Sequence, residues 1–445
     1  MNVDGSKVLR LAALAGIAAL AACGEREVIL PGERLGIREV LDTRDGDPGA
    51  PVNRAAPAAL PAPVQNGAWT QSPVSPHIRT DHAALSSAPQ RIWSVDIGQG
   101  DVKRQRLNAD PVTDGARVYT LSSDFVVSAV STNGAVLWQR QIVPARDAAF
   151  QAQGGGLALG GGLLFVASGF GELVALDPAQ GGEVWRQDLQ DTATGAPSFR
   201  DGLVYITSGD SVGWAIEARD GRVRWRVDGV PDVGNVAGAP APAIGPERVV
   251  FAFGDGTVQS RFRQGGDTVW SEIIAGSRRG RVLARIDDVT GDPTLAGDTV
   301  YIGTHSGRFT ARDQATGEAR WTVEKGALDR PAVVGNSVYF VSDLNELVRL
   351  DRATGAQIWA VDLPGWRPVA RPARRRDQSV ANHGPVLAGG LLWVASTDGA
   401  LRGFAPTDGR LAAQVPVDGG ATTEPIVAGG TLYVVTGDGA LAAYR

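Results

Sequence analysis

PAVVGNSVYFVSDLNELVRLDRATGAQIW, residues 331–359, contains the pattern that decides the fold. A proline opens it, short alternating stretches follow, and Gly355 precedes Trp359 by four residues. Alternation of apolar and polar residues between turns that contain Asp and Gly is typical of β-strands joined as hairpins. The stretch therefore predicts four antiparallel strands, of which the last holds the tryptophan.

The same unit recurs along residues 91–445. The glycine and tryptophan, four residues apart, occur at Gly134/Trp138, Gly181/Trp185, Gly221/Trp225, Gly266/Trp270, Gly317/Trp321 and Gly355/Trp359. A seventh copy has Gly409 but Ala413 at the tryptophan position. Prolines open the units at positions 111, 197, 242, 293, 331, 385 and 425. Eight units over 91–445 give about 44 residues each, the usual length of a propeller blade.

The two ends of the repeat region complement each other. The last unit, Pro425–Arg445, has three predicted strands, and the first segment, RIWSVDIG at 91–98, resembles a tryptophan strand without its own hairpin partner. Pairing them removes two open edges. We therefore predict an all-β, eight-bladed β-propeller with four antiparallel strands per blade, closed by pairing of the N-terminal strand with the C-terminal blade. A two-sheet sandwich is the alternative, but eight equal units would be unusual there.

The N-terminus predicts export. Residues 1–22 hold a short basic region and an apolar stretch, Leu11–Ala22, too short to cross a bilayer as a helix. The sequence LAACG around Cys23 resembles the lipobox of bacterial lipoproteins. This resemblance implies cleavage before Cys23, acylation of that cysteine, and, with Gly24 next, retention at the outer membrane. The alternative is an ordinary signal peptide with a chance cysteine.

Residues 23–90 are predicted as a lipidated N-terminus and tether. The stretch 47–63 is rich in Pro and Ala, so we expect it to be extended and mostly unfolded. Trp69 is the exception, because a lone tryptophan in a linker often docks on the adjacent domain. The propeller is then the domain 91–445.

Composition and motifs argue against several functions. A net charge of −5 argues against nucleic acid as a partner, and a single cysteine allows no intrachain disulfide. Gly209–Gly213 matches G-x-S-x-G, but it falls in a predicted hairpin rather than at a strand-to-helix turn. The four histidines, His77, His82, His305 and His383, lack metal-ligand spacing. We therefore expect no catalytic residue, no metal and no cofactor.

Four junctions between blades are longer than the others: 143–157, 228–241, 275–292 and 364–384. Each joins a tryptophan strand to the next proline strand, so all four lie on one face of a propeller. We predict this face to be the binding platform, since loops held by a scaffold carry function. Neutral drift in loop length is the alternative. The basic run Arg371–Arg376 could meet an acidic partner or lipid head groups, or be a solvated loop.

The repeat VYV…DG.L.ALD..TG...W resembles the pyrroloquinoline-quinone-type propeller repeat. Quinoprotein dehydrogenases and the BamB family carry it. A lipobox followed by a propeller of this size resembles the BamB family, lipoproteins of the outer-membrane β-barrel assembly (Bam) machinery. This implies a non-enzymatic scaffold at the periplasmic face of the outer membrane, with BamA (through its POTRA domains) and other Bam lipoproteins as partners, able to guide unfolded outer-membrane proteins. The alternative is a periplasmic PQQ-dependent dehydrogenase, but that class typically has a vicinal cysteine pair.

Two junctions resemble partner-binding segments of the BamB family. Residues 285–293 are similar to R-x-x-D-V-D-x-x-P, with Arg285 and Asp288 matching and Thr290 replacing the second acidic residue. Residues 236–242 are similar to L-R-G-x-S-x-P, read here as Val236-Ala237-Gly238, without the arginine. The resemblance implies contact with BamA at these residues. Arg278, Arg279 and Arg281 are nearby candidates if the charge pairing differs.

Overall fold

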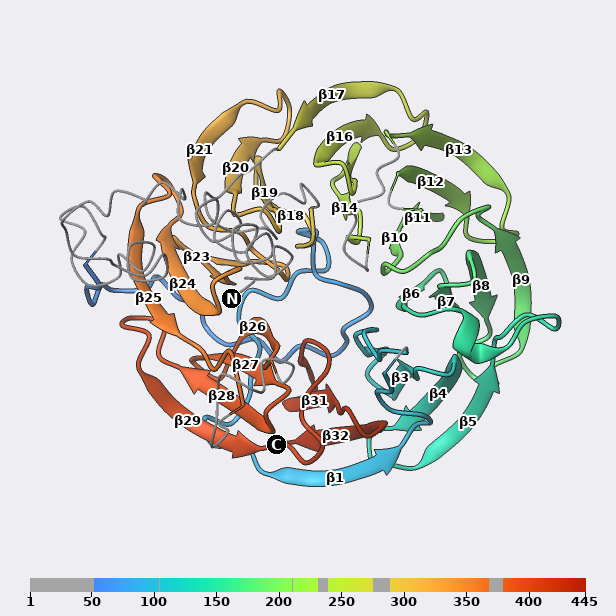
Figure 1. Ribbon diagram of the computed structural model, residues 1–445, viewed down its shortest axis with the longest axis horizontal. Coiled ribbons are helices and arrows are strands. Elements are labelled where there is room, and N and C mark those ends of the chain that lie inside the picture. Colours follow the sequence, from blue (N-terminus) through green and yellow to red (C-terminus); the bar gives the residue numbers. More distant parts are fainter. Residues whose placement is uncertain (1–51, 104, 210, 231–238, 275–288, 368–378) are drawn as a thin grey trace, which may run out of the picture. The chain divides into compact units, whose positions relative to one another are not determined.

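The computed structural model describes residues 52–445 except 104, 210, 231–238, 275–288 and 368–378. These residues form eight four-stranded antiparallel sheets arranged in a ring, the blades of a β-propeller (Figure 1). The predicted fold class is confirmed. In the described residues, no helix is long and apolar enough to cross a membrane.

Blades 1 to 7 each contain four consecutive strands, ordered from the ring centre outwards. Blade 1 holds β2 (Val112–Thr113), β3 (Arg117–Leu121), β4 (Val126–Ser131) and β5 (Val136–Gln141), and blade 2 holds β6 (Gly155–Gly160), β7 (Leu163–Ser168), β8 (Glu172–Leu176) and β9 (Glu183–Asp188). Blade 3 holds β10 (Ser198–Arg200), β11 (Leu203–Ser208), β12 (Val212–Glu217) and β13 (Val223–Asp228), and blade 4 holds β14 (Ala243–Ile244), β15 (Arg248–Ala252), β16 (Thr257–Phe262) and β17 (Thr268–Ile273). Blade 5 holds β18 (Thr294–Ala296), β19 (Thr299–Gly303), β20 (Phe309–Asp313) and β21 (Ala319–Val323), and blade 6 holds β22 (Ala332–Val334), β23 (Ser337–Val341), β24 (Glu346–Asp351) and β25 (Gln357–Asp362). Blade 7 holds β26 (Asn382–Ala388), β27 (Leu391–Ser396), β28 (Ala400–Phe404) and β29 (Leu411–Pro416).

Blade 8 is built from both ends of the repeat region, as predicted. It holds β30 (Ile426–Ala428), β31 (Thr431–Val435), β32 (Ala440–Tyr444) and, as its outer strand, β1 (Arg91–Asp96). β1 pairs antiparallel with β32, and Gln90 and Arg445 exchange two backbone hydrogen bonds of 2.8 and 2.9 Å. The ring is therefore closed by hydrogen bonds, without an open sheet edge between its first and last blades.

The core lies between the blades. The second and third strands are mostly buried on both faces, whereas the outer strands alternate, as in β13 with its pattern of exposed and partly buried residues. A blade stacks a neighbour on each face, so its middle strands carry nearly continuous apolar side chains. Apolar burial between sheets is thus the main source of stability.

The recurring tryptophan links a blade to the next one at every blade except blade 7. Seven indole N–H groups donate to a backbone carbonyl of the following blade, at 2.8 to 3.3 Å: Trp93, Trp138, Trp185, Trp225, Trp270, Trp321 and Trp359. The turn glycine of the following blade lies against the ring. A Cβ on Gly181, for example, would come within 2.7 Å of Trp138, and its φ is +71°. Glycine is therefore required at this turn for space and for backbone conformation.

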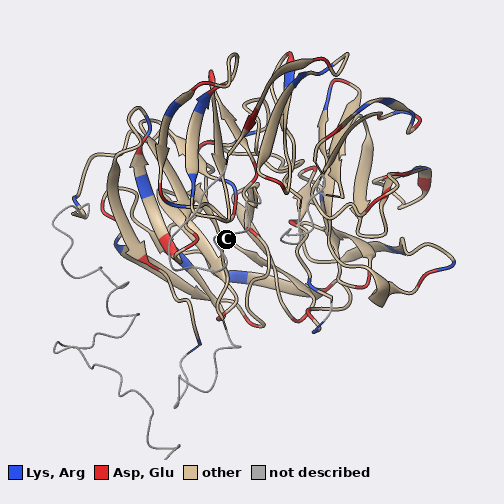
Figure 2. Ribbon diagram, turned by 45° about the horizontal axis from the view of Figure 1, so that its top comes forward, with Lys and Arg blue, Asp and Glu red and all other residues tan. Residues whose placement is uncertain are grey.

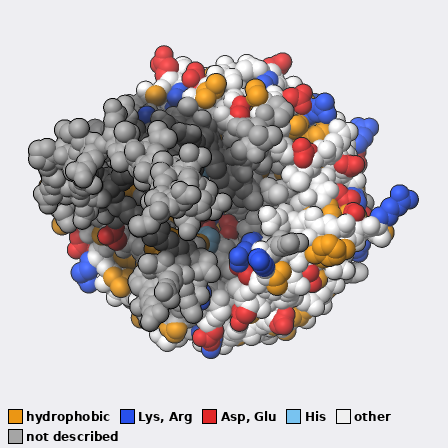
Figure 3. Space-filling view, in the orientation of Figure 1, with side chains coloured by type: hydrophobic (Ala, Val, Ile, Leu, Met, Phe, Trp, Pro, Cys, Tyr) orange, Lys and Arg blue, Asp and Glu red, His pale blue; other side chains and the backbone are white. Residues whose placement is uncertain are grey.

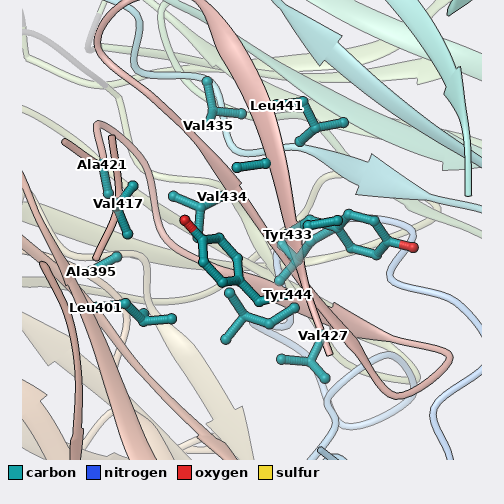
Figure 4. Close-up of a cluster of buried hydrophobic side chains, with 14 of the residues drawn as sticks. Ala395, Leu401, Val417, Ala421, Val427, Tyr433, Val434, Val435, Leu441 and Tyr444 are labelled. Atoms are coloured by element: carbon teal, nitrogen blue, oxygen red, sulfur yellow. The ribbon is translucent and has the colours of Figure 1, made fainter. Parts of the chain in front are cut away.

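Ala413, the exception to this pattern, faces the one blade that lacks the turn. Blade 8 has the two chain segments 90–91 and 444–445 where the other blades have a turn between their last two strands. No turn carbonyl is present there for a tryptophan to reach. Instead an apolar cluster fills the space between blades 7 and 8, with Leu401, Tyr433 and Tyr444 among its members (Figure 4), and Tyr444 Oη donates to the Pro416 carbonyl at 3.1 Å.

Residues 52–90, here called the N-terminal strap, differ from the expected unfolded tether. The strap is extended, but it lies in the middle of the ring (Figure 1) and forms hydrogen bonds with the blades. Backbone bonds join Trp69 to Thr113 in both directions, at 2.8 and 2.9 Å, and Thr70 to Leu159 at 2.7 Å. Trp69 is 6% exposed, so it docks on the blades, a point that the sequence alone left open. These hydrogen bonds use main-chain groups of the strap and of the inner strands. Because every residue type has such groups, the Pro- and Ala-rich composition did not indicate that the strap binds the blades.

Candidate functional site

The junctions between blades and the turns after each second strand lie on one face of the ring, here called the junction face. The opposite side, with the turns after each first and third strand, is called the hairpin face. Nine partner-contact residues were predicted on two junctions, and Thr290 is the one that lies in the described part. Its hydroxyl donates to the Ala327 carbonyl at 3.4 Å. Outside the described residues lie Cys23, the run Arg371–Arg376, and Val236, Ala237, Gly238, Arg278, Arg279, Arg281, Arg285 and Asp288.

The described ends of the two junctions meet at Asp292. Asp292 Oδ1 accepts a hydrogen bond of 2.8 Å from the Ala241 amide, which ends the junction into blade 4. Asp292 itself ends the junction into blade 5, and its Oδ2 accepts a hydrogen bond of 2.8 Å from the hydroxyl group of Ser72 in the strap. The structure therefore brings together the described ends of the two segments that resemble partner-binding segments, although the residue that joins them was not predicted.

Charged residues converge at the ring centre, just before the prolines that open the blades. Asp110, Asp292, Arg330 and Glu424 directly precede Pro111, Pro293, Pro331 and Pro425, and Asp329 lies next to Arg330. This set of five is here called the axial cluster. Sequence reasoning noted the prolines but not these residues; the signal was a charged residue before the opening proline in four units. Because every innermost strand starts at the junction face, these side chains meet there.

Arg330 is the centre of the axial cluster. It forms ion pairs with Glu424, from blade 8, and with Asp110, from blade 1, the latter at 3.4 Å. The backbone amide of Glu424 donates to Asp110 Oδ1 at 2.9 Å, and the Arg330 guanidinium lies 5.7 Å from the centroid of the Trp69 ring. Arg330 therefore crosses from blade 6 to blades 8 and 1 and also holds the strap.

The axial cluster has four carboxyl groups and one guanidinium group. Their burial and their charges shift the pKa value of each group. Burial, with the neighbouring carboxylates, raises the pKa of Asp110 to about 6 and that of Asp329 to about 7. Burial raises the pKa of Glu424 well above its ordinary value and also raises that of Asp292. Burial opposes the charge on Arg330, but the carboxylates of Glu424 and Asp110 raise its pKa overall. Near neutral pH the cluster therefore binds protons that the unfolded chain would release.

Other motifs in the described residues form no catalytic arrangement. Ser211 lies in the turn between β11 and β12, as expected of a hairpin. His77 contacts Arg200, His82 binds the strap carbonyl of Pro61, and His383 lies 3.7 Å from Asp329. Over the described ranges, no group of three or more His, Cys, Asp or Glu residues is placed to hold a metal ion.

The described part of the ring centre between the strap and blades 6 and 7 leaves little room for a quinone cofactor. The strap occupies the space inside the innermost strands, and the cavity left between it and blades 6 and 7, lined in part by Trp69, Arg79 and Arg330, measures about 30 Å³. A cavity for a drug-sized planar molecule is roughly 300 Å³ or more. Within the described residues, this position suits ordered water rather than a tricyclic quinone.

On the described residues that Figures 2 and 3 show, surface charges of both signs are mixed. Acidic and basic residues lie side by side along the outer strands (Figure 2), and several form exposed pairs such as Arg224 with Glu217 at 3.3 Å. In the face shown in Figure 3, hydrophobic side chains form small separate patches between charged ones. Among the exposed apolar side chains, Phe150 and Trp366, at 71% and 57% exposed, lie on long junctions. These junctions therefore offer aromatic contact points.

Comparison with known proteins identifies the family of this propeller. The family described as outer membrane protein assembly factor BamB matches residues 123–361 and 363–445. The outer membrane protein assembly factor BamB of Moranella endobia is 25% identical over 250 residues, which are 54% of this chain and 63% of the relative. The chain thus spans somewhat less than two thirds of that relative's length.

Solved structures show the same fold. The crystal structure of BamB from Moraxella catarrhalis has a TM-score of 0.64 at 18% identity and covers 80% of this chain and all of that one. The quinohemoprotein alcohol dehydrogenase from Comamonas testosteroni has a TM-score of 0.66 at 16% identity and covers 86% of this chain and 81% of that one. At such identities these likenesses concern the fold alone, which scaffolds and enzymes share.

Proposed function

Because this chain belongs to the family of outer membrane protein assembly factor BamB, we propose that it is a non-enzymatic scaffold subunit of the outer-membrane β-barrel assembly (Bam) complex. In this role it binds BamA through the POTRA domains, works beside the other Bam lipoproteins, and assists the folding and insertion of outer-membrane proteins. The family match over most of the blades is the observation that carries the proposal.

The proposed location is the periplasmic face of the outer membrane, with acyl chains on Cys23 as the anchor. Two or more acyl chains hold a protein stably on a bilayer, whereas one gives marginal binding. Replacement of Cys23 by alanine should move the protein from the membrane fraction to the soluble periplasmic fraction. Unchanged membrane association of that variant would contradict the anchor.

The partner surface is proposed to be the junction face, around the residues predicted on the two junctions, Val236–Gly238 and Arg278–Thr290. The strap supports this assignment, since it bonds to the turns of several blades on the hairpin face and leaves less surface free there. The described end of this surface contains Thr290 and Asp292, next to the buried segment Ala239–Pro242.

Affinity purification of the tagged chain from detergent-solubilised outer membranes tests the proposal. BamA should co-elute with the chain, and a tagged lipoprotein of unrelated fold serves as the control. Absence of BamA from the eluate would contradict the assignment. Quinone absorbance in the purified protein, together with alcohol-dependent reduction of a dye, would instead favour the dehydrogenase alternative.

A further inference from the structure

Ser72 in the strap reaches the point where the junctions into blades 4 and 5 end. Ser72 is 7% exposed, and its hydroxyl group donates a hydrogen bond of 2.8 Å to Asp292 Oδ2. The other oxygen of that carboxyl group accepts a hydrogen bond of 2.8 Å from the Ala241 amide. One carboxyl group therefore joins three segments that are far apart in the sequence: the strap, the end of the junction 228–241 and the end of the junction 275–292.

We propose that Asp292 and Ser72 form a positioning pair, which holds the described ends of the two junctions together and links them to the strap. This inference rests on the proposed function, in which these junctions contact BamA. Asp292 and Ser72 are positioning residues, because they act through the junction ends and are not assigned a contact with the partner.

The strap around Ser72 is itself fixed to the blades that carry these junctions. The Gln71 side chain bonds in both directions with the backbone of Phe199 in blade 3, at 2.5 and 3.1 Å. The Leu295 amide of blade 5 donates to the Val74 carbonyl at 2.7 Å, and the Ile244 amide of blade 4 donates to Ser75 Oγ at 2.6 Å. Residues 71–75 therefore set the relative position of blades 3, 4 and 5, and Ser72 extends this alignment to the junction ends.

A carboxyl group is well suited to this position. Two acceptor oxygens can bind two donors on opposite sides, here a main-chain amide and a hydroxyl group. Asparagine has the same shape and keeps one acceptor oxygen for the amide, and its NH₂ group can donate to the Ser72 hydroxyl. Alanine removes both bonds. Comparison of asparagine with alanine thus separates the bonds from the charge, and the neutral Asp292→Asn is the matched control.

Binding of purified BamA periplasmic domains to the full chain tests the inference. Asp292→Ala should weaken BamA binding by about tenfold, Ser72→Ala by about threefold, and Asp292→Asn by less than about twofold. The reason is that loss of a hydrogen bond to a buried group costs about 1 kcal/mol, which is a several-fold change in a binding constant. The exposed Ser87→Ala should bind as the wild-type chain does. Circular dichroism melting must show each variant folded at the assay temperature.

A second readout requires no partner. Hydrogen exchange of the Ala241 amide, measured by mass spectrometry on a peptide covering 239–245, should quicken in Ser72→Ala although serine does not contact that amide. Exchange as slow as in the wild-type chain, or undiminished BamA binding by folded Asp292→Ala, would overturn the inference while the proposed function stands. If the wild-type chain does not bind BamA, the proposed function fails, and the exchange of the Ala241 amide still decides whether the pair acts as one unit.

Discussion

Replacement of Arg349 by alanine should release the first part of the N-terminal strap. Arg349, in β24, is fully buried, and its guanidinium donates to the carbonyls of Ala56 and Pro57 at 2.7 Å each. The same group donates to the carbonyls of Pro406 and Thr407 in blade 7, both at 3.2 Å. Arg349 therefore fastens the strap where it enters the ring, between blades 6 and 7.

The expected magnitude follows from the two bonds to the strap. Hydrogen bonds with a charged donor contribute about 1.5–3 kcal/mol each, so loss of both should weaken strap docking by about 3 kcal/mol or more. Residues 52–58 are largely exposed, so their carbonyls can turn to water when released. The effect is thus local opening rather than loss of the whole fold, and 3 kcal/mol raises the open population on the order of 100-fold.

Limited trypsin digestion measures this opening, because the backbone amide of Arg54 is bonded to the Ile358 carbonyl at 3.0 Å in the docked state. Cleavage after Arg54 follows the open population when opening and closing are fast relative to cleavage. The Arg349→Ala chain should therefore be cut on the order of 100-fold faster there. Arg222→Ala, in an exposed pair with Asp220 in the turn between β12 and β13, is the control and should leave the rate unchanged. An equal rate of cleavage after Arg54 in the two variants would refute the role of Arg349 in holding the strap.

Three further predictions concern the ring. Carboxyl pKa values raised in the folded state mean that these carboxyl groups hold more protons in the folded chain than in the unfolded one, so their contribution to stability should fall as the pH rises from about 6.5 to about 8. Burial lowers the pKa of His383, and unfolded histidines, with an ordinary pKa of about 6.5, release protons over the same range, so they act in the opposite direction. Urea midpoints at the two pH values measure the carboxyl contribution as a difference between chains: the wild-type midpoint should fall more, or rise less, than that of Asp329→Asn, and an equal change in both would contradict it. Arg330→Met removes the cation of the axial cluster and should destabilise the ring by about 3–5 kcal/mol, with partial recovery at about pH 5; equal loss at both pH values would exclude the electrostatic cause. Trp359→Ala should reduce the unfolding free energy by about 3–5 kcal/mol, against less than about 1 kcal/mol for the exposed Leu411→Ala, and similar urea midpoints for both would refute the role of the tryptophan contact.

The blades could be predicted because their determinants are local and repeat. A proline, a glycine turn and a tryptophan recur at similar spacing, and each reports one hairpin or one contact between blades. The ends of the repeat were informative as well: the segment around Trp93 lacks a hairpin partner and the last unit lacks a fourth strand, so closure at blade 8 could be predicted from them. The reason for Ala413, which packs against the cluster between blades 7 and 8, became clear only in the structure.

The axial cluster and the strap could not be predicted in the same way. Asp110, Arg330 and Glu424 are separated by long stretches of sequence and meet because the ring places the starts of all innermost strands around one axis. The strap binds largely through backbone groups, which leave little signal in composition. Of the candidate site, the junction face was predicted, whereas Asp292, which joins two junction ends to the strap, required the three-dimensional arrangement.

Site-specific photo-crosslinking in cells tests the central claim most directly, namely that this propeller presents its junction face to BamA while the strap occupies the ring centre and bonds to the hairpin-face turns. A crosslinker at Phe150 or Trp366 reports the junction face, and one at Arg219, in the turn between β12 and β13, reports the hairpin face with a similarly exposed side chain. The account predicts adducts with BamA from the junction-face positions and none from Arg219. Adducts from Arg219 alone, or from none of the three, would contradict it.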